Sequence, residues 1–483
     1  MARQVLNLVG GKMQLGRPLA AVARLHGSAR SARVTVKGGS IEWARGLLVD
    51  TEEGSMRWRE TFDDLIFTLD MTGRAVFERL RTGMLFNPQR SDLRADPYPY
   101  YRWLRERDPV HRSYPAGGWV LSRYDDILAV LADRAASADE RNWSRYHFEN
   151  ARHIRSGLPD PYEAGLASML RLDPPDHTRL RTLVSKAFTP RAIERLRPRI
   201  AAVVDELLGA VLSRGGQFDL MRDFASPLPV AIIAEMLGVD VTDRARFRHW
   251  SNEATRLLGD QTRDDRRRAW AALQEMRAWI ADQTEARRRA PLDDLLSGLV
   301  AAEDAGERLS SGELFGTCVL LLIAGNETTT NLIGNGILAL LRNPDQLDHL
   351  RRMPETIATA VEELVRYDSP VQLTSRFALT DHSLDGRRVR RGQQLVLLIG
   401  AGNRDPRRFA DPDRLDLSRP DVRPLSFGHG LHFCLGAQLA RLEAQIAIPR
   451  LLEHCPDLRL GQGEILWSDN IILRGPRSLP LAA

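Results

Sequence analysis

The sequence is poor in cysteine, because its 483 residues contain only three, Cys318, Cys434 and Cys455. No two of them are spaced as C-x-x-C, so neither a disulfide framework nor a zinc knuckle is indicated. Unpaired thiols are typical of a reducing compartment, and we therefore expect the protein in the cytoplasm. Cys434 stands out from the other two because it lies between a glycine-rich loop and a predicted helix.

Long apolar runs and lysines are also scarce. The longest apolar run, residues 318–324, is far shorter than the roughly 20 residues that cross a bilayer, so we expect no membrane anchor. Only three of the 68 basic residues are lysines, and the basic residues are interleaved with 63 acidic ones. A net charge of +5 that is distributed in this way argues against binding to nucleic acid.

The length and composition suit one large globular domain and a smaller one. Proline, asparagine and aspartate interrupt the periodic pattern between residues 84 and 101, so we predict domains at residues 1–83 and 84–483. Helical spacing is found at residues 99–108, 123–133, 174–188, 190–215 and 358–367. Short strands are predicted at residues 118–122, 376–389, 393–400 and 465–475. The larger domain is therefore predicted to be mainly α with small β-sheets.

The longest predicted helix begins at a capping box, Ser310 to Glu313, and ends before Pro344. Its roughly 32 residues would extend nearly 50 Å, so it must cross the domain. The helix is apolar nearly all round except at residues 326–331, NETTTN. Buried polar groups cost free energy unless they are satisfied. Either the threonines bond back to carbonyls one turn earlier and Glu327 pairs with a buried arginine, or this segment carries chemistry.

Cys434 lies within FGHGLHFCLG, residues 427–436. Glycines let the backbone approach a flat partner closely, and the free N–H groups at a helix N-terminus favour a thiolate. We therefore expect Cys434 to be ionised, whereas Cys318 and Cys455 suit small, buried apolar side chains. The alternative that Cys434 is also a buried apolar side chain stays open at this point.

This loop resembles the haem-binding signature of the cytochromes P450, FGxGxHxCxG, at every specified position. Further motifs of that family lie in the expected order within residues 84–483, namely DPPDHTRLR, AGNETT and EELVR. The resemblance implies a soluble, bacterial-type P450 in which the Cys434 thiolate holds the iron of haem b, iron protoporphyrin IX. The residues that it places beside the haem are His177, Arg181, Ala324, Gly325, Arg376, Phe427, Gly428, His432 and Gly436.

Two groups of charged residues support the haem in this resemblance. The haem propionates need positive partners when the ring is buried. The candidates are His177, Arg181, Arg376 and His432. Glu363 and Arg366, at i and i+3, can pair on one helix face, and the resemblance adds Arg414 of PDRLD as their third member.

Glu327 and Thr328 are the catalytic residues that the resemblance implies, since the hydroxyl steadies oxygen and the acid supplies protons. The implied reaction inserts one oxygen atom of O2 into an organic, largely apolar substrate. Two other functions stay open, a peroxide-driven peroxygenase and a non-enzymatic haem-thiolate sensor. A sensor would not need an acid and a hydroxyl in a buried helix, which favours the monooxygenase.

No segment has the pattern of a flavin, nicotinamide or iron–sulfur domain, so we expect electrons from an external ferredoxin and its ferredoxin reductase. The ferredoxin is expected to be acidic and to dock on the cysteine side of the haem. The basic residues expected there are Arg179, Arg181, Lys186 and Arg441. The resemblance places the substrate near residues 140–167, 224–259, 320–324, 371–374 and 466–472.

Residues 1–83 lie outside the P450 pattern and are predicted to be a small α+β region. The predicted order is strand, helix, strand pair and helix, at residues 3–11, 17–27, 32–43 and 73–83. This order resembles the HPr phosphocarrier fold, but Leu15 stands where that family has its phosphorylated histidine, so phosphoryl transfer is not implied. An irregular extension, or sequence upstream of the true start, is the alternative.

Overall fold

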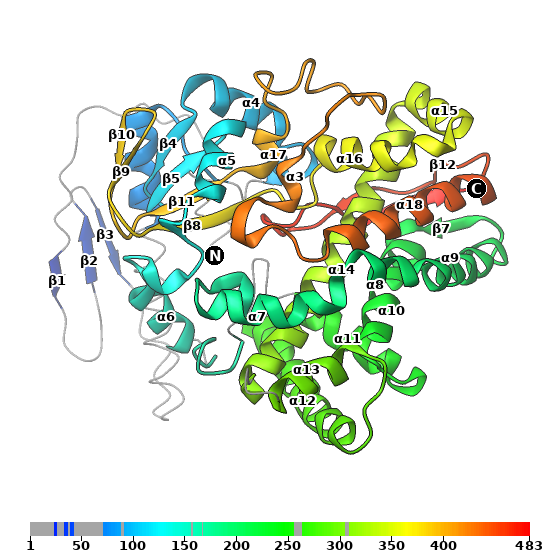
Figure 1. The fold of residues 1–483 in the computed structure, drawn as a ribbon. Helices are drawn as coiled ribbons and strands as arrows, with labels where there is room; N and C mark the ends of the chain where they lie inside the picture. Colours follow the sequence, from blue (N-terminus) through cyan, green and yellow to red (C-terminus); the bar gives the residue numbers. More distant parts are fainter. Residues whose placement is uncertain are drawn as a thin grey trace. The chain divides into compact units, whose positions relative to one another are not determined.

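The structure is a computed structural model that describes residues 24–26, 33–36, 39–42 and 71–483, with gaps at 88–90, 156–157, 167, 256–262 and 305–308. The chain divides into two compact units, Met1–Thr68 and Leu69–Ala483. The elements are coloured along the chain in Figure 1. None of the helices in the described ranges is both long enough and apolar enough to pass through a membrane.

The described part of the first unit is an antiparallel sheet in the order β1-β2-β3. Its strands are β1 (Arg24–His26), β2 (Arg33–Val36) and β3 (Gly39–Glu42). Strands β2 and β3 confirm the predicted strand pair. Strand β1 lies at the end of the helix predicted at residues 17–27, so that prediction is wrong there, because pairing with β2 overrides local helix propensity. The strand predicted at residues 3–11 and Leu15 lie outside the described residues, so the likeness to HPr stays a prediction.

Helices form most of the second unit. Residues 71–82 form its first helix. The later helices are α3 (Ser91–Ala95), α4 (Tyr98–Arg107), α5 (Tyr124–Ala132), α6 (Tyr146–Arg155), α7 (Asp176–Ser185), α8 (Pro190–Arg195), α9 (Arg197–Leu212), α10 (Pro227–Met236), α11 (Arg244–Thr255), α12 (Arg263–Arg289), α13 (Leu295–Asp304), α14 (Ser311–Arg342), α15 (Pro344–Arg352), α16 (Ile357–Tyr367), α17 (Ile399–Gly402) and α18 (Ala437–His454). A π-helical turn, η4 (Met221–Ala225), precedes α10.

The largest described sheet of this unit has the order β4-β5-β11-β8-β6, and only the β5–β11 pair within it is parallel. The strands of the unit are β4 (Val110–Ser113), β5 (Gly118–Leu121), β6 (Ala136–Ser137), β7 (Gln217–Asp219), β8 (Thr374–Ala378), β9 (His382–Leu384), β10 (Arg387–Val389), β11 (Gln394–Leu397), β12 (Arg459–Leu460), β13 (Leu466–Trp467), β14 (Pro476–Ser478) and β15 (Pro480–Ala482). A Cβ at Gly118 would come within 1.8 Å of the Gln394 carbonyl oxygen, so the parallel pairing requires glycine there.

The second unit begins earlier than the boundary predicted after residue 83. Glu78, in the helix of residues 71–82, is fully buried, and its carboxylate accepts hydrogen bonds from the N–H groups of Phe86 and Tyr114 at 2.6 and 2.7 Å. It also lies 3.1 Å from Nε2 of His111 on β4. The stretch of residues 84–101 therefore lies within this unit, and its described part contains α3 and the beginning of α4.

Helix α14 confirms the longest helix prediction. The capping box of Ser310 and Glu313 is present, and Asn343 ends the helix before Pro344 begins α15. The single helix predicted at residues 190–215 is wrong, because the structure divides it into α8 and α9 at Leu196. Pro198, in the first turn of α9, has no N–H to continue the ladder of α8, so a new helix begins there.

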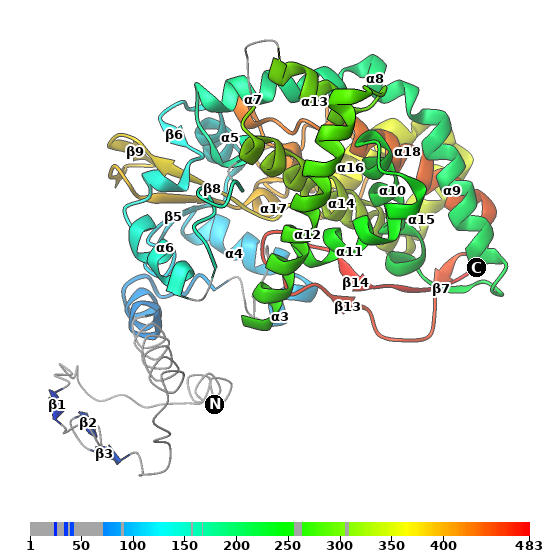
Figure 2. The same cartoon turned by 90° about the horizontal axis from the view of Figure 1, so that it is seen from below.

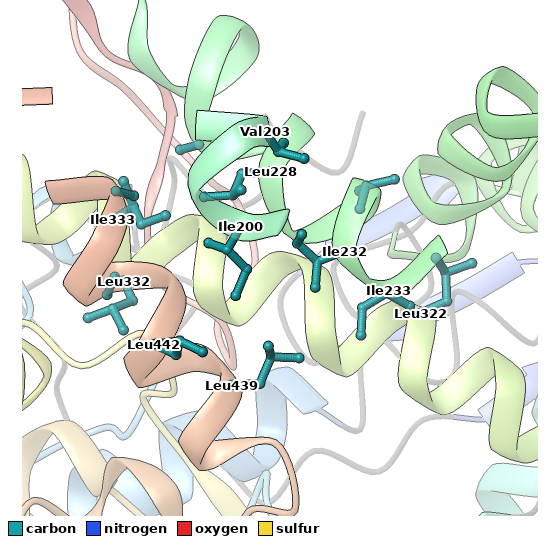
Figure 3. Close-up of a cluster of buried hydrophobic side chains, with 14 of the residues drawn as sticks. Ile200, Val203, Leu228, Ile232, Ile233, Leu322, Leu332, Ile333, Leu439 and Leu442 are labelled. Atoms are coloured by element: carbon teal, nitrogen blue, oxygen red, sulfur yellow. The ribbon is translucent and has the colours of Figure 1, made fainter. Parts of the chain in front are cut away.

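The main hydrophobic core surrounds α14. Figures 1 and 2 show the sheet with α4, α5 and α17 on one side of this helix and α8 to α13 on the other. Figure 3 shows buried side chains of α9 and α10 above α14, and Leu442 of α18 close to Leu332 of α14. This packing brings the middle of α14 and the start of α18 into one region of the core.

Candidate functional site

The loop before α18 is shaped by two glycines with positive φ, Gly428 at 71° and Gly430 at 68°. A Cβ at Gly430 would come within 2.7 Å of the Leu131 carbonyl oxygen of α5, so the loop can lie this close only with glycine. The N–H of Cys434 donates to the Phe427 carbonyl oxygen at 2.8 Å. Cys434 is thus held directly before the N-terminus of α18.

The three cysteines differ in their surroundings. Cys318 and Cys455 are each 1% exposed, and burial raises the pKa of the Cys318 thiol to about 12. The Cys434 side chain is exposed. Cys318 and Cys455 therefore are the small buried side chains that the sequence predicts, and Cys434 is not.

The expectation that Cys434 is ionised by its position alone is wrong. Although solvent reaches the side chain, the protein atoms around it partly desolvate the Cys434 thiol and raise its pKa, while the Gly436 N–H, Arg441 and Arg181 lower it. The helix N-terminus therefore contributes without outweighing desolvation. Binding to a metal ion would displace the thiol proton, so Cys434 can still act as a thiolate ligand.

Four cation-forming side chains from different elements gather on one side of this loop. They are His177 and Arg181 of α7, Arg376 of β8 and His432. The rings of His177 and His432 are 4.3 Å apart, and Arg181 Nη2 donates to the carbonyl oxygen of Phe433 at 2.7 Å. The sequence places these residues far apart, and the fold brings them together.

In the described part of the chain, no carboxylate forms an ion pair with any of these four side chains. Burial and the charge of Arg376 lower the pKa of His432 to about 3, and burial lowers the pKa of Arg376 to about 10. His177 is 1% exposed, and neither of its ring nitrogens has a hydrogen-bond partner within the described part of the chain. Asp173 opposes the pKa shifts of His177 and Arg376, but its carboxylate accepts hydrogen bonds from Ser137 and from the Ala138 N–H. The group therefore suits a ligand with negative charges.

The polar segment of α14 provides an acid and a hydroxyl. Burial raises the pKa of Glu327 to about 7. The described residues offer no arginine partner for its carboxylate, so the alternative that Glu327 pairs with a buried arginine is wrong. Thr328 Oγ1 donates to the Ala324 carbonyl oxygen at 2.7 Å, as the first part of that alternative expects. A Cβ at Gly325 would lie 2.9 Å from Ile233, which gives Gly325 a role in packing α10 against α14. Its predicted place beside the cofactor stays a prediction.

Ala324 and Thr328 share one face of α14, because residues four apart are neighbours on a helix. Ala324 is exposed although most of the helix around it is buried, and Cys434 is exposed in the loop before α18. Both side chains therefore border space that the protein does not fill itself. An accessible helix face, a thiol and the unpartnered nitrogens of His177 are what a flat, dianionic haem needs, so these residues fit that cofactor.

Two hollows among the described residues do not coincide with this group. A hollow of about 650 Å³ is lined by Arg81, Trp103, Arg112 and Trp119, none of which is a predicted site residue. Two segments predicted near the substrate, residues 371–374 and 466–472, meet at a hollow of about 40 Å³. That volume holds only water-sized molecules, so it is no substrate chamber.

The support expected around Glu363 and Arg366 has a different third member. Glu363 and Arg366 are both fully buried and form two hydrogen bonds, at 2.6 and 2.7 Å. The guanidinium that joins them belongs to Arg419, whose Nε donates to Glu363 at 3.2 Å, while Arg414 contributes only its carbonyl oxygen. The prediction of Arg414 is wrong because the motif was matched by local spacing, and the chain turns back between these two arginines.

The surface predicted to dock a ferredoxin has less unpaired positive charge than expected. Arg179 is paired with Glu313 and Asp176, and Arg441 donates to Glu362 at 3.0 Å. Lys186 is exposed. Two of the four predicted cations are therefore neutralised by carboxylates that the sequence pattern does not place beside them.

Known proteins resemble this chain over most of its length. A family model described as Cytochrome P450 matches residues 247–458. The polyketide biosynthesis cytochrome P450 PksS of Bacillus subtilis (strain 168) is 40% identical over 411 residues, which cover 83% of this chain and 98% of PksS. The solved structure of PksS gives a TM-score of 0.74 at 40% identity and covers 82% of this chain and 99% of that chain.

Two other relatives match similar lengths. The cytochrome P450 monooxygenase PikC of Streptomyces venezuelae is 43% identical over 398 residues, covering 81% of this chain and 92% of PikC. Vitamin D(3) 25-hydroxylase of Pseudonocardia autotrophica is 43% identical over 392 residues, covering 80% of this chain and 93% of the hydroxylase. With relatives this similar over almost their whole length, the chain belongs to the cytochrome P450 family of haem-thiolate monooxygenases.

Proposed function

We propose that this monooxygenase holds haem b at Cys434 and inserts one oxygen atom of O2 into a large, mainly apolar organic molecule, with electrons from an external ferredoxin and ferredoxin reductase. The observation that carries the proposal is the accessible Cys434 thiol in a core that also contains Glu327 and Thr328. All three cysteines are free, which supports a reducing, cytoplasmic compartment.

In this proposal the chain holds the haem by charge and by shape. His177, Arg181, Arg376 and His432 would donate hydrogen bonds to the propionates. The backbone at Phe427, Gly428 and Gly436 keeps the cysteine loop close to the ring, and Ala324 and Gly325 leave the opposite face open. When bound, the haem supplies the activation of O2 and the insertion of its oxygen into a C–H bond.

Glu327 and Thr328 are proposed to deliver protons. Because the pKa of Glu327 lies at about 7, its carboxyl group can both release and regain a proton near neutral pH. The Thr328 hydroxyl donates to the Ala324 carbonyl oxygen, so its lone pairs are free to accept a hydrogen bond from the cofactor side. Both side chains are only partly exposed to solvent, which would limit the access of bulk water to the reaction.

The substrate class is inferred from the relatives. One relative is named for polyketide biosynthesis and another for the hydroxylation of vitamin D(3). Polyketides and vitamin D(3) are large molecules with few charges. We propose a substrate of this kind, made in secondary metabolism. The probe substrate for the tests below is the compound that shifts the Soret band most strongly in a panel of macrolactones, vitamin D(3), steroids and fatty acids.

Replacing Thr328 with alanine is expected to keep haem and probe-substrate binding but to lower the amount of product formed per NADPH by roughly tenfold. The proton relay loses its hydroxyl, so reduced oxygen leaves as peroxide instead. The measurement compares NADPH consumed, product formed and hydrogen peroxide released. Thr329→Ala is the matched control, because Thr329 is the neighbouring buried threonine, at 2% exposure. Full coupling in Thr328→Ala would disprove the assigned roles.

The same assay separates the two rival functions. A peroxygenase would form product with peroxide and none with reduced ferredoxin, and its activity would not depend on Thr328. A sensor would bind haem and form no product under either condition. The buried acid with a pKa of about 7 favours the monooxygenase, since neither rival requires a proton source of this kind.

The ferredoxin is proposed to dock beside the cysteine loop. Leu431 and Phe433 are 38% and 40% exposed there, and Arg181 donates to the Phe433 carbonyl oxygen. Lys186 is exposed and directly follows α7, the helix that carries Arg181. An acidic ferredoxin would match this mixture of apolar and basic groups. The contact would be screened by salt, with a Debye length of about 8 Å at physiological ionic strength.

Lys186→Glu is expected to raise the ferredoxin concentration for half-maximal turnover by roughly fivefold at low salt, because it places a carboxylate against an acidic partner. Arg352→Glu on α15 is the matched control, as Arg352 is also exposed but lies on another helix. Turnover is measured against ferredoxin concentration at low and high salt. An unchanged half-maximal concentration for Lys186→Glu would exclude this docking surface and leave the monooxygenase assignment intact.

A further inference from the structure

The polar segment of α14 has a second face that the proposed proton relay does not use. At 100° per residue, Asn326 and Thr330 lie about one turn apart and roughly 160 to 200° around the helix from Thr328. Both are buried, at 5% and 7% exposure. An apolar side chain would fill this buried position without the cost of burying a polar group, so the amide of Asn326 needs an explanation.

Asn326 links α14 to two neighbouring elements. Its Nδ2 donates to Oγ of Ser251 on α11 at 2.7 Å, and Ser251 is fully buried. The Thr330 hydroxyl lies 3.2 Å from both Asn326 Oδ1 and the Ala225 carbonyl oxygen, at the end of the π-helical turn η4. The amide is therefore satisfied only when this face of α14 points toward α11 and η4.

The partners of Asn326 are themselves fixed. Trp250, the residue before Ser251, packs against Phe247 of α11 and Trp279 of α12, with ring centroids 6.4 and 5.9 Å apart. On the α10 side, Gly325 allows Ile233 to approach the backbone of α14 closely. This turn of α14 is thus located by three elements.

An external support matters at this turn because the helix is weakened there. Thr328 Oγ1 occupies the Ala324 carbonyl oxygen, and hydroxyls that bond back in this way bend helices. A rotation of the turn would move Glu327 and Thr328 away from the directions that the proposed relay requires. A buried amide with fixed partners resists that rotation, since turning the helix would leave its polar atoms unpaired.

We propose that Asn326 is a positioning residue for oxygen activation, which holds the rotation of α14 through Ser251 and Thr330 so that Glu327 and Thr328 stay directed at the cofactor. This inference rests on the proposed roles of Glu327 and Thr328. It assigns a function to a polar residue that the P450 motif leaves unspecified, and it makes α11 part of the support for the relay.

The test compares Asn326→Leu and Ser251→Ala with Asn335→Leu. Asn335 is a matched control on the same helix, because it is 1% exposed and donates to the carbonyl oxygens of Asp368 and Arg474 away from the relay. Each variant is purified as the holoenzyme, and its band at about 450 nm, its Soret shift with the probe substrate and its thermal midpoint are recorded. Coupling is then measured as hydrogen peroxide and product per NADPH.

Asn326→Leu is expected to keep the band and the Soret shift while product per NADPH falls by roughly tenfold and peroxide rises. Ser251→Ala should uncouple in the same direction, and the double variant should be no worse than Asn326→Leu, since both remove one interaction. Asn335→Leu should lower the thermal midpoint without changing the coupling.

Full coupling in Asn326→Leu, or equal uncoupling in Asn335→Leu, would overturn the proposal, because the effect would then be absent or merely structural. If Asn326→Leu does not fold, Ser251→Ala alone decides by the same criteria. Full coupling in Thr328→Ala would instead refute the relay itself, so a failure of the relay and a failure of Asn326 as its support give different results.

Discussion

Replacing Cys434 with alanine is expected to abolish both the absorption band at about 450 nm of the reduced carbon monoxide complex and the monooxygenase activity. Cys434 is the exposed thiol, held before α18 by the hydrogen bond of its N–H to Phe427. Alanine leaves this loop unchanged in shape but removes the sulfur that would bind iron. The spectrum and product formation from the probe substrate are measured on the same preparation.

Cys318→Ala and Cys455→Ala are the matched controls. Both thiols are buried at 1% exposure, so a metal ion or a cofactor cannot reach either of them. These variants should lose about 1 kcal/mol of stability and keep the band and the activity. A Cys434→Ala protein that retains the band, or a Cys318→Ala protein that lacks it, would contradict the assignment of the iron ligand.

The parts of the fold that could be predicted are those whose signals are local. The ends of α14 follow from a capping box and from Pro344, both within a few residues of the ends that they define. The Cys434 loop is equally local, because its glycines and its cysteine lie within ten residues. Strand β1 is not predictable from a helical pattern, because its pairing with β2 determines it. The break at Leu196 depends on one proline within a sequence that otherwise has helical spacing.

The parts of the site that could not be predicted depend on distant partners. Arg419 was missed in favour of Arg414, because five residues of separation place the two side chains on different sides of a turn. The ionisation of Cys434 was overestimated since a sequence shows the helix N-terminus but not the desolvation. Asn326 was seen only as one member of a polar run, because its partner Ser251 is 75 residues away.

A second large effect is expected from Glu363→Ala, which should lower the free energy of unfolding by about 3–5 kcal/mol and cause haem loss. The change leaves the Arg366 guanidinium buried, at 0% exposure, without the carboxylate that balances it. It also removes the acceptor for the Asp416 N–H and for Arg419. Since domains are stable by only about 5–15 kcal/mol, much of the stability would be lost.

The haem loss follows from the contacts of Arg366. Its Nη1 donates to the carbonyl oxygen of Asn403 at 2.9 Å. The Asn403 side chain in turn accepts from the Leu425 N–H at 2.7 Å and donates to Ser426 Oγ at 2.8 Å. Leu425 and Ser426 lead into the Cys434 loop, so a displaced Arg366 disturbs the loop that carries the iron ligand.

Two arginines provide the decisive comparison for this arrangement. Arg419→Ala should cost about 1–2 kcal/mol, because it removes one charged hydrogen bond from Glu363 at a side chain that is 9% exposed. Arg414→Ala should change stability by no more than about 0.5 kcal/mol, because this side chain is exposed and only its carbonyl oxygen, which alanine keeps, meets Arg366. Denaturant unfolding and haem retention are measured for all three variants. If Arg414→Ala proved as damaging as Arg419→Ala, the third member of the Glu363 cluster would be the one that the motif predicts, and the geometry described for Arg419 would be incorrect.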